Sequence, residues 1–194
     1  MGALPTVLLT GFEPYVPGLD VNPSWEIVRP LDGLEVEGWH VAAVRLPVAY
    51  GLAAAALARA VEVARPQAIV SFGMHRRGPS VDVERRFRFA SRDGEALEPG
   101  ESGEPPHRAS LLPVERVLSE LTAAGFTARA SDDAGLFVCE HTGFTAIGIA
   151  RRLGLALAGF VHVPAPDQLE IARQLEIPRA VLRAIRDPEP SASA

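Results

Sequence analysis

Residues 41–72 read VAAVRLPVAYGLAAAALARAVEVARPQAIVSF, and this stretch decides the fold class. Residues 41–47 and 68–72 are short, almost continuously apolar runs, which predict buried strands. Between them, residues 52–64 repeat apolar side chains at helical spacing, which predicts a helix. Strands that alternate with helices in this way are typical of an α/β sheet covered on both faces.

The same alternation extends over most of the chain. Further strands are predicted at 7–10, 127–131 and 159–163, and further helices at 113–125, after residue 139 and at 168–185, with a break or fresh start at Pro178. Residues 93–106 lack apolar periodicity, which indicates a surface loop. We therefore expect a single domain over residues 1–186 and a flexible tail at 187–194.

Composition narrows the function classes. The net charge of −5, from 19 basic and 24 acidic residues, argues against a general nucleic-acid binder or a protein that binds anionic membranes. No apolar stretch reaches the ~20 residues that a membrane span needs. A single cysteine cannot form an intrachain disulfide or a cysteine-based zinc site. These features, with no signal-peptide pattern at the N-terminus, predict a cytoplasmic protein.

The single cysteine, Cys139, lies in residues 131–142, SDDAGLFVCEHT, where a strand is expected to run through Gly135 into a helix. The unpaired N–H groups and the dipole at a helix N-terminus favour the thiolate, which is the nucleophilic form. A single cysteine with a distant histidine is a signature of intracellular thiol hydrolases. The alternative is a buried structural thiol, and position alone slightly favours it.

Two other residues complete a candidate hydrolytic site. His162 ends an apolar strand, where an imidazole can serve as general base or can simply be a hydrogen-bonded core residue. Its place at the carboxyl end of the strand, where open α/β sheets bind ligands, favours catalysis. Glu84 lies in an alternating run and could orient the imidazole. Spacing alone favours an exposed strand acid paired with Arg85 or Arg86 instead.

Five sequence blocks in order resemble those of pyroglutamyl peptidase I, the pyrrolidone-carboxylate peptidases. They are Gly11-Phe-Glu-Pro-Tyr15, Asn22-Pro-Ser24, Leu46-Pro-Val48, the segment from Ser131 to Cys139, and Gly159-Phe-Val-His-Val-Pro164. The resemblance covers the chain from Val7 to about Pro166. It implies a single three-layer α/β/α domain with a mostly parallel, mixed sheet. It also implies a cysteine peptidase that removes N-terminal pyroglutamate from peptides.

The resemblance implies a role for each matching residue. Cys139 matches the nucleophile, His162 the general base and acid, and Glu84 the third member of the triad. The remaining matches concern the substrate: Phe12, Tyr15 and Asn22 match the loop of the pyroglutamate pocket, and Met74 lies where the family makes a further pocket contact. The resemblance implies no metal and no other cofactor, and it implies a homo-oligomer such as a dimer or tetramer.

The chain also departs from the family pattern. Residues 73–79 read GMHRRGP, so cations replace the small residues of a glycine-rich loop. Glu140 replaces the usual asparagine after the cysteine, and a carboxylate close to the sulfur would raise the thiol pKa. These changes leave two alternative hypotheses open. One is a thiol hydrolase for another N-blocked or cyclic substrate, and the other is a catalytically silent binding protein on the same fold.

Overall fold

The computed structural model describes residues 3–88 and 107–186. The predicted loop at 93–106 and the predicted tail at 187–194 lie outside these ranges. The strands are β1 (Thr6–Phe12), β2 (Glu35–Val36), β3 (Trp39–Leu46), β4 (Ala68–His75), β5 (Val81–Glu84), β6 (Arg86–Arg88), β7 (His107–Ala109), β8 (Ala128–Ser131) and β9 (Leu157–Pro164). The helices are α1 (Pro23–Glu26), α2 (Leu52–Ala64), α3 (Val114–Ala123), α4 (Val138–Leu153), α5 (Ile171–Gln174) and α6 (Glu176–Arg186), with a 3-10 turn, η1, at Arg29–Leu31.

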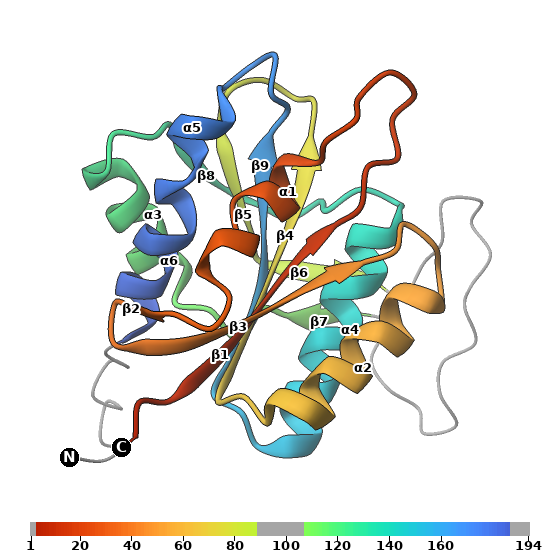
Figure 1. The fold of residues 1–194 in the computed structure, drawn as a ribbon, viewed down its shortest axis with the longest axis vertical. Coiled ribbons are helices and arrows are strands. Elements are labelled where there is room, and N and C mark those ends of the chain that lie inside the picture. Colours follow the sequence, from red (N-terminus) through yellow and green to blue (C-terminus); the bar gives the residue numbers. More distant parts are fainter. Residues whose placement is uncertain (1–2, 89–106, 187–194) are drawn as a thin grey trace.

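A mixed seven-stranded sheet runs through the middle of the molecule in the order β2-β3-β1-β4-β9-β5-β8 (Figure 1). Strands β3, β1, β4 and β9 are parallel. β5 runs antiparallel to β9, and β8 runs parallel to β5. Of the parallel strands, β1, β4 and β9 are short, mostly apolar and buried on both faces, as the sequence predicts, whereas β3 is partly exposed.

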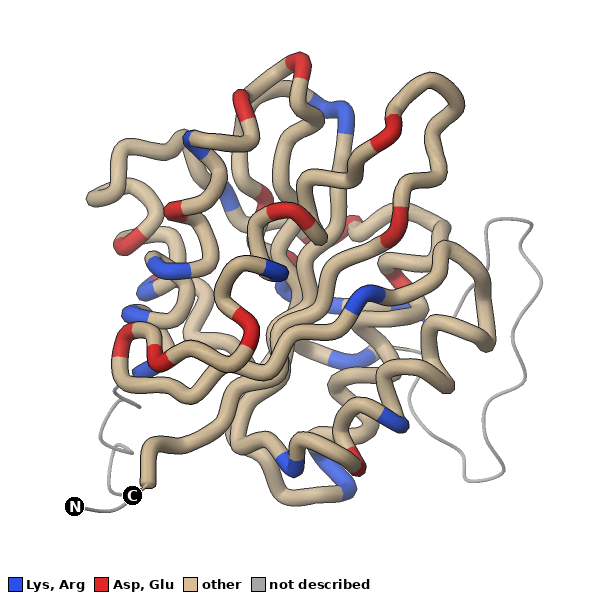
Figure 2. Tube along the Cα trace, in the orientation of Figure 1, with Lys and Arg blue, Asp and Glu red and all other residues tan. Residues whose placement is uncertain are grey.

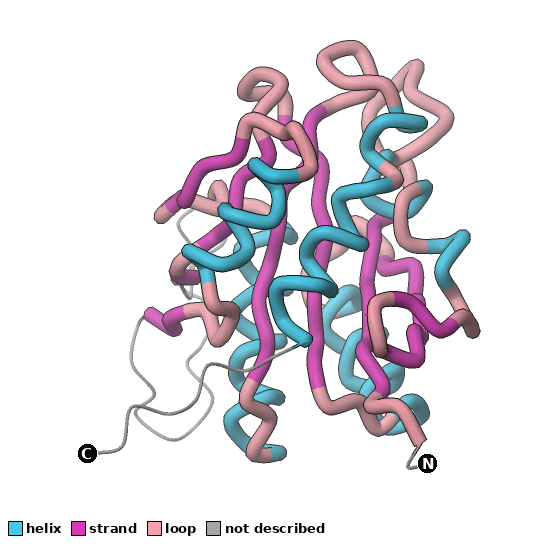
Figure 3. Tube along the Cα trace, turned by 90° about the vertical axis from the view of Figure 1, so that its left-hand side faces the viewer, coloured by secondary structure: helices cyan, strands magenta, loops and turns pink. Residues whose placement is uncertain are grey.

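Helices cover both faces of this sheet, which confirms the three-layer α/β/α architecture. Figure 1 shows α2 and α4 on one side and α3, α5 and α6 on the other, and the turned view in Figure 3 shows the same layering. Each interface has its own apolar core. One includes Leu57 of α2 and Ile147 of α4, and the other includes Val117 of α3 and Val181 of α6. Acidic and basic residues are interspersed over the trace (Figure 2).

The last helical region differs from the prediction in where it breaks. α5 ends at Gln174 and α6 begins at Glu176, so the break comes before Pro178 rather than at it. Pro178 lies in the first turn of α6, where backbone N–H groups have no intrahelical acceptor and a proline costs little.

Among the described residues, no helix combines the length and the apolar character that crossing a membrane requires.

The strand predicted at 127–131 is present as β8, but it does not continue through Gly135 into the Cys139 helix. β8 ends at Ser131, which pairs with Glu84. Because β5 and β8 run against β9, the end of β8 does not lie at the carboxyl edge of the parallel strands. Residues 132–137 carry the chain onward to α4, with Gly135 in a left-handed conformation at φ 78°. A loop, not a strand end, therefore delivers Cys139 to its position.

Candidate active site

His162 and Glu84 form a buried hydrogen-bonded pair between neighbouring strands. The Nδ1 atom of His162 on β9 lies 2.7 Å from Oε1 of Glu84 on β5, and both side chains are almost fully buried. An ionised carboxylate can only accept hydrogen bonds, so Nδ1 carries the proton and Nε2 is left for another partner. The structure thus contradicts the alternative of an exposed Glu84 paired with Arg85. Arg85 instead bonds to Asp132.

Gly73 explains how the thiol comes next to this pair. Gly73 on β4 is in register with His162 on β9, so both residues face the same side of the sheet. A Cβ built on Gly73 would stand 3.0 Å from Sγ of Cys139 and 2.7 Å from Cζ of Phe160. The sulfur therefore packs onto the bare backbone of Gly73, directly beside the imidazole. Any side chain at this position would compete with the thiol for space.

The electrostatics of His162 follow from its two partners. Burial lowers the pKa of this imidazole, but hydrogen bonds and charge from Cys139 and Glu84 outweigh burial and raise the pKa to about 9. The imidazolium form is therefore favoured at neutral pH. A cationic imidazole between a carboxylate and a thiol is the arrangement that supports a thiolate nucleophile.

Cys139 is the second residue of α4, as the sequence predicts, and its side chain is partly exposed. The first turn of a helix leaves N–H groups without intrahelical acceptors, and the helix dipole places partial positive charge there. Phe137, the N-cap residue, makes no side-chain hydrogen bond to this turn. The start of α4 can thus stabilise negative charge both on the sulfur and on an oxygen close to it.

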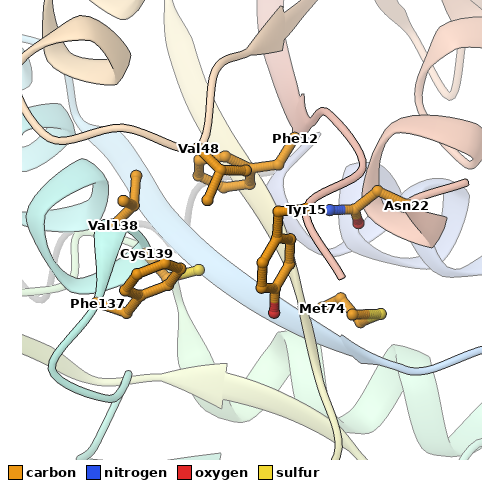
Figure 4. Close-up of a pocket in the computed structure, with 8 residues that line it drawn as sticks. All are labelled: Phe12, Tyr15, Asn22, Val48, Met74, Phe137, Val138 and Cys139. Carbon is orange, nitrogen blue, oxygen red and sulfur yellow. The ribbon is translucent and has the colours of Figure 1, made fainter. Parts of the chain in front are cut away.

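A small pocket opens at the thiol. Its empty volume, including space open to solvent, is about 230 Å³. The residues that line it come from four different parts of the chain and are Phe12, Tyr15, Asn22, Val48, Met74, Phe137, Val138 and Cys139. Figure 4 shows the sulfur of Cys139 and the rings of Tyr15 and Phe137 grouped around this space. The lining is mostly aromatic and aliphatic, which suits a small uncharged ligand.

All four residues predicted to bind substrate line this pocket, but one of them has another task as well. Oδ1 of Asn22 accepts hydrogen bonds from the N–H and the hydroxyl of Ser24, and its Nδ2 donates to the carbonyl of Glu13. Asn22 is thus the N-cap of α1 and holds the β1–α1 loop in shape. Met74 belongs to β4, which continues to His75, beyond the predicted strand end at Phe72.

The sequence analysis missed three residues of the pocket lining, Val48, Phe137 and Val138. A signal for each was present, because Val48 ends one of the recognised blocks and the other two directly precede Cys139. The ring of Phe137 lies 5.8 Å from the ring of Tyr15, centroid to centroid, so it forms part of the aromatic wall.

The sequence analysis expected the charge of Glu140 to act on the Cys139 thiol, but in the structure this carboxylate has a close partner of its own, Arg88. Its buried carboxylate accepts a hydrogen bond from the backbone N–H of Arg88 and lies against the guanidinium of the same residue. Burial raises the pKa of Glu140, and these contacts with Arg88 oppose that rise. Much of the carboxylate's charge is therefore met by Arg88, which ties β6 to the first turn of α4.

The cations at 76 and 77 also have defined partners. Arg76 pairs with Asp167 at 3.0 Å on the surface. Nη2 of Arg77 lies 3.2 Å from Asp82 and 3.6 Å from Glu84. The loop after β4 therefore contributes a charge next to the candidate site, because Arg77 faces Glu84, the acid that contacts His162.

Comparison with known proteins decides the family. The sequence profile described as pyroglutamyl peptidase matches residues 5–185. The chain belongs to the pyroglutamyl peptidase family. It is 38% identical to a pyrrolidone-carboxylate peptidase of Gloeobacter violaceus, over 93% of this chain and 96% of that one. It is 37% identical to the pyrrolidone-carboxylate peptidase of Chromobacterium violaceum, over 84% of this chain and 80% of that protein.

Solved structures of the pyroglutamyl peptidase family have the same fold. Pyroglutamyl peptidase I of Bacillus amyloliquefaciens superimposes with a TM-score of 0.83 at 26% identity, over 93% of this chain and 96% of that one. A mutant pyrrolidone carboxyl peptidase from Pyrococcus furiosus gives the same TM-score and identity, over 92% of this chain and 97% of that one. The resemblance recognised in five sequence blocks is thus confirmed over nearly the whole length.

Proposed function

We propose that this protein is a cysteine exopeptidase that releases N-terminal pyroglutamate from peptides, with Cys139, His162 and Glu84 as its triad. The observation that carries this proposal is the buried His162–Glu84 pair at 2.7 Å beside a thiol that rests on Gly73. Membership of the pyroglutamyl peptidase family supplies the reaction. The small, mostly apolar pocket at the sulfur supports specificity for the small, uncharged lactam ring of pyroglutamate.

In the acylation step, the thiolate of Cys139 attacks the carbonyl carbon that joins pyroglutamate to the next residue. A C–S bond forms, and the carbonyl oxygen gains negative charge that N–H groups at the start of α4 can stabilise. His162 donates its Nε2 proton to the leaving nitrogen, the C–N bond breaks, and the shortened peptide departs. The product on the enzyme is a thioester of pyroglutamate.

In the deacylation step, neutral His162 accepts a proton from water as the water oxygen attacks the thioester carbon. The C–S bond breaks, free pyroglutamate leaves, and the thiolate–imidazolium pair is restored. Glu84 fixes the imidazole through Nδ1 and stabilises its cation throughout.

The pocket suits the lactam ring of pyroglutamate. The ring is flat and uncharged, so it needs no carboxylate of the kind that would hold a free N-terminal ammonium. Phe12 reaches the pocket from the end of β1, Tyr15 from the loop that follows, and Phe137 from the start of α4. These rings can enclose the lactam, while backbone groups at the rim can hydrogen-bond to its amide.

The test is turnover of a pyroglutamyl amide that carries a fluorescent leaving group. We expect release of the fluorophore by the wild-type protein and loss of at least ~10³-fold in kcat for Cys139→Ser, because a serine hydroxyl in this setting is a far weaker nucleophile than a thiolate. Thermal unfolding of the variant should match wild type, since the substitution nearly preserves shape.

Two other outcomes would favour the alternatives. Faster turnover of another blocked aminoacyl amide than of the pyroglutamyl amide would indicate a thiol hydrolase with different specificity. No turnover of any such amide, together with alkylation of Cys139 no faster than that of an ordinary thiol of pKa ~8.5, would indicate a silent binding protein.

A further inference from the structure

We infer that Arg77 is a positioning residue that acts through Glu84, and this inference rests on the proposed function. Arg77 belongs to the loop between β4 and β5, where the family pattern has small residues. Its guanidinium lies near Oε1 of Glu84, the oxygen that also contacts Nδ1 of His162, so the contacts run Arg77–Glu84–His162–Cys139. Arg77 is not among the residues that line the pocket at Cys139, and it makes no contact with substrate in the mechanism above.

The guanidinium of Arg77 is held by two other groups. Nη1 donates a hydrogen bond of 2.9 Å to the carbonyl of Asp133, in the loop that leads to Cys139. Nη2 lies 3.2 Å from Oδ2 of Asp82, and this same atom lies 3.6 Å from Oε1 of Glu84. Its backbone N–H also donates to Nδ1 of His75. These contacts fix the position of the charge although the side chain is 39% exposed.

Of the two acids, Glu84 depends on Arg77 more than Asp82 does. Asp82 already receives two hydrogen bonds from Arg129, at 2.8 and 3.0 Å, and one from the hydroxyl of Ser80. Glu84 is fully buried, and its Oε2 atom has no hydrogen-bond partner among the described residues. Its ion pairs within that part of the chain are with His162 and Arg77.

This dependence matters during turnover. His162 gives up its charge when it protonates the leaving nitrogen. At that moment Arg77 is the one cation left in contact with Glu84 among the described residues. A buried carboxylate without a charged partner is costly, and it tends to take up a proton or to rotate away. Arg77 keeps Glu84 aligned with Nδ1 through both halves of the cycle.

The experiment is a double-mutant cycle between Arg77→Ala and Glu84→Gln, measured by kcat, KM and the rate at which iodoacetamide alkylates Cys139. In the wild-type background we expect Arg77→Ala to lower kcat by about tenfold, as is typical when a group that orients a reacting residue is lost. KM should stay within about twofold, because Arg77 is outside the pocket lining. In the Glu84→Gln background the same substitution should change kcat less than about twofold.

Two further variants separate positioning from folding. Arg77→Lys keeps the charge and should recover part of kcat, although it cannot make both the Asp82 and the Asp133 contacts. Arg76→Ala removes the neighbouring cation and its surface pair with Asp167, and it should leave kcat within about twofold. Urea unfolding of each variant shows whether the fold is retained.

The inference is overturned if Arg77→Ala lowers kcat equally in both backgrounds, or leaves it unchanged in the wild-type background. Slower alkylation of Cys139 in Arg77→Ala than in wild type, with no such difference in the Glu84→Gln background, supports it without any substrate. Because alkylation needs no peptide, a failure of the proposed function would appear separately, as rapidly alkylated wild-type protein that cleaves no pyroglutamyl amide.

Discussion

Gly73→Ala tests the packing on which the candidate site depends. The added Cβ would meet Cζ and Cε1 of Phe160 at 2.7 and 2.9 Å and Sγ of Cys139 at 3.0 Å. Ordinary contacts of this kind begin near 3.4 Å, so at least one neighbour must move by several tenths of an ångström. Phe160 is fully buried, and its ring packs 4.8 Å from the ring of His162 and 6.3 Å from the ring of Phe12. The sulfur, which is partly exposed, is the freer of the two.

We expect Gly73→Ala to act on both stability and rate. Overpacking of a filled core costs about 1–3 kcal/mol, and in a domain of this size each kcal/mol lowers Tm by roughly 2–4 °C. Displacing the thiol from the imidazole should lower kcat by roughly 10- to 100-fold, because reacting groups are sensitive to misplacement on this scale. Urea unfolding and turnover of the pyroglutamyl amide measure the two effects.

Ser71→Ala is the matched control for this prediction. Ser71 lies on the same strand and face, and its buried hydroxyl has no hydrogen-bond partner among the described residues. Its removal should leave kcat within about twofold and stability within about 1 kcal/mol. Wild-type kcat and unchanged unfolding in Gly73→Ala would refute the close packing of the thiol. A destabilised but fully active Gly73→Ala protein would refute the catalytic part of the argument.

Two further predictions concern charge. Glu84→Gln removes one of the two groups that raise the pKa of His162 to about 9, so the alkaline limb of the kcat/KM profile should move down by roughly 1–2 pH units; an unmoved limb would assign it to another group. Burial raises the pKa of Asp82, but hydrogen bonds from Arg129 and Ser80 outweigh burial and hold it below its ordinary value. Asp82→Asn should therefore cost about 3 kcal/mol at pH 7 in urea unfolding, since it leaves a buried pair broken. The difference in unfolding free energy between wild type and Asp82→Asn should shrink as the pH falls below ~4 and through the depressed pKa of Asp82, because the carboxylate is then protonated. An equal difference at pH 7 and pH 3 would contradict the role of this carboxylate.

The fold was largely predictable because its signals are local. Helix α2 begins and ends where its apolar spacing predicts, at Leu52 and Ala64, and the parallel strands follow the apolar runs. The break or fresh start predicted at Pro178 is found two residues earlier, since α6 begins at Glu176 and Pro178 lies in its first turn. The strand predicted at 127–131 is present as β8, Ala128–Ser131, but the segment between it and Cys139 is a loop, which the local pattern did not predict.

The sequence by itself determined the α/β class, the candidate nucleophile at a helix start and, through its blocks, the family. Only the tertiary structure decided that Glu84 is buried against His162 rather than paired at the surface with Arg85. It also decided that Gly73 makes room for the thiol and that Glu140 meets Arg88. The reason is physical: helical and strand periodicity arises from neighbours in the chain. Burial and charge pairing at this site arise from contacts between distant residues, such as Glu84 and His162, which are 78 positions apart.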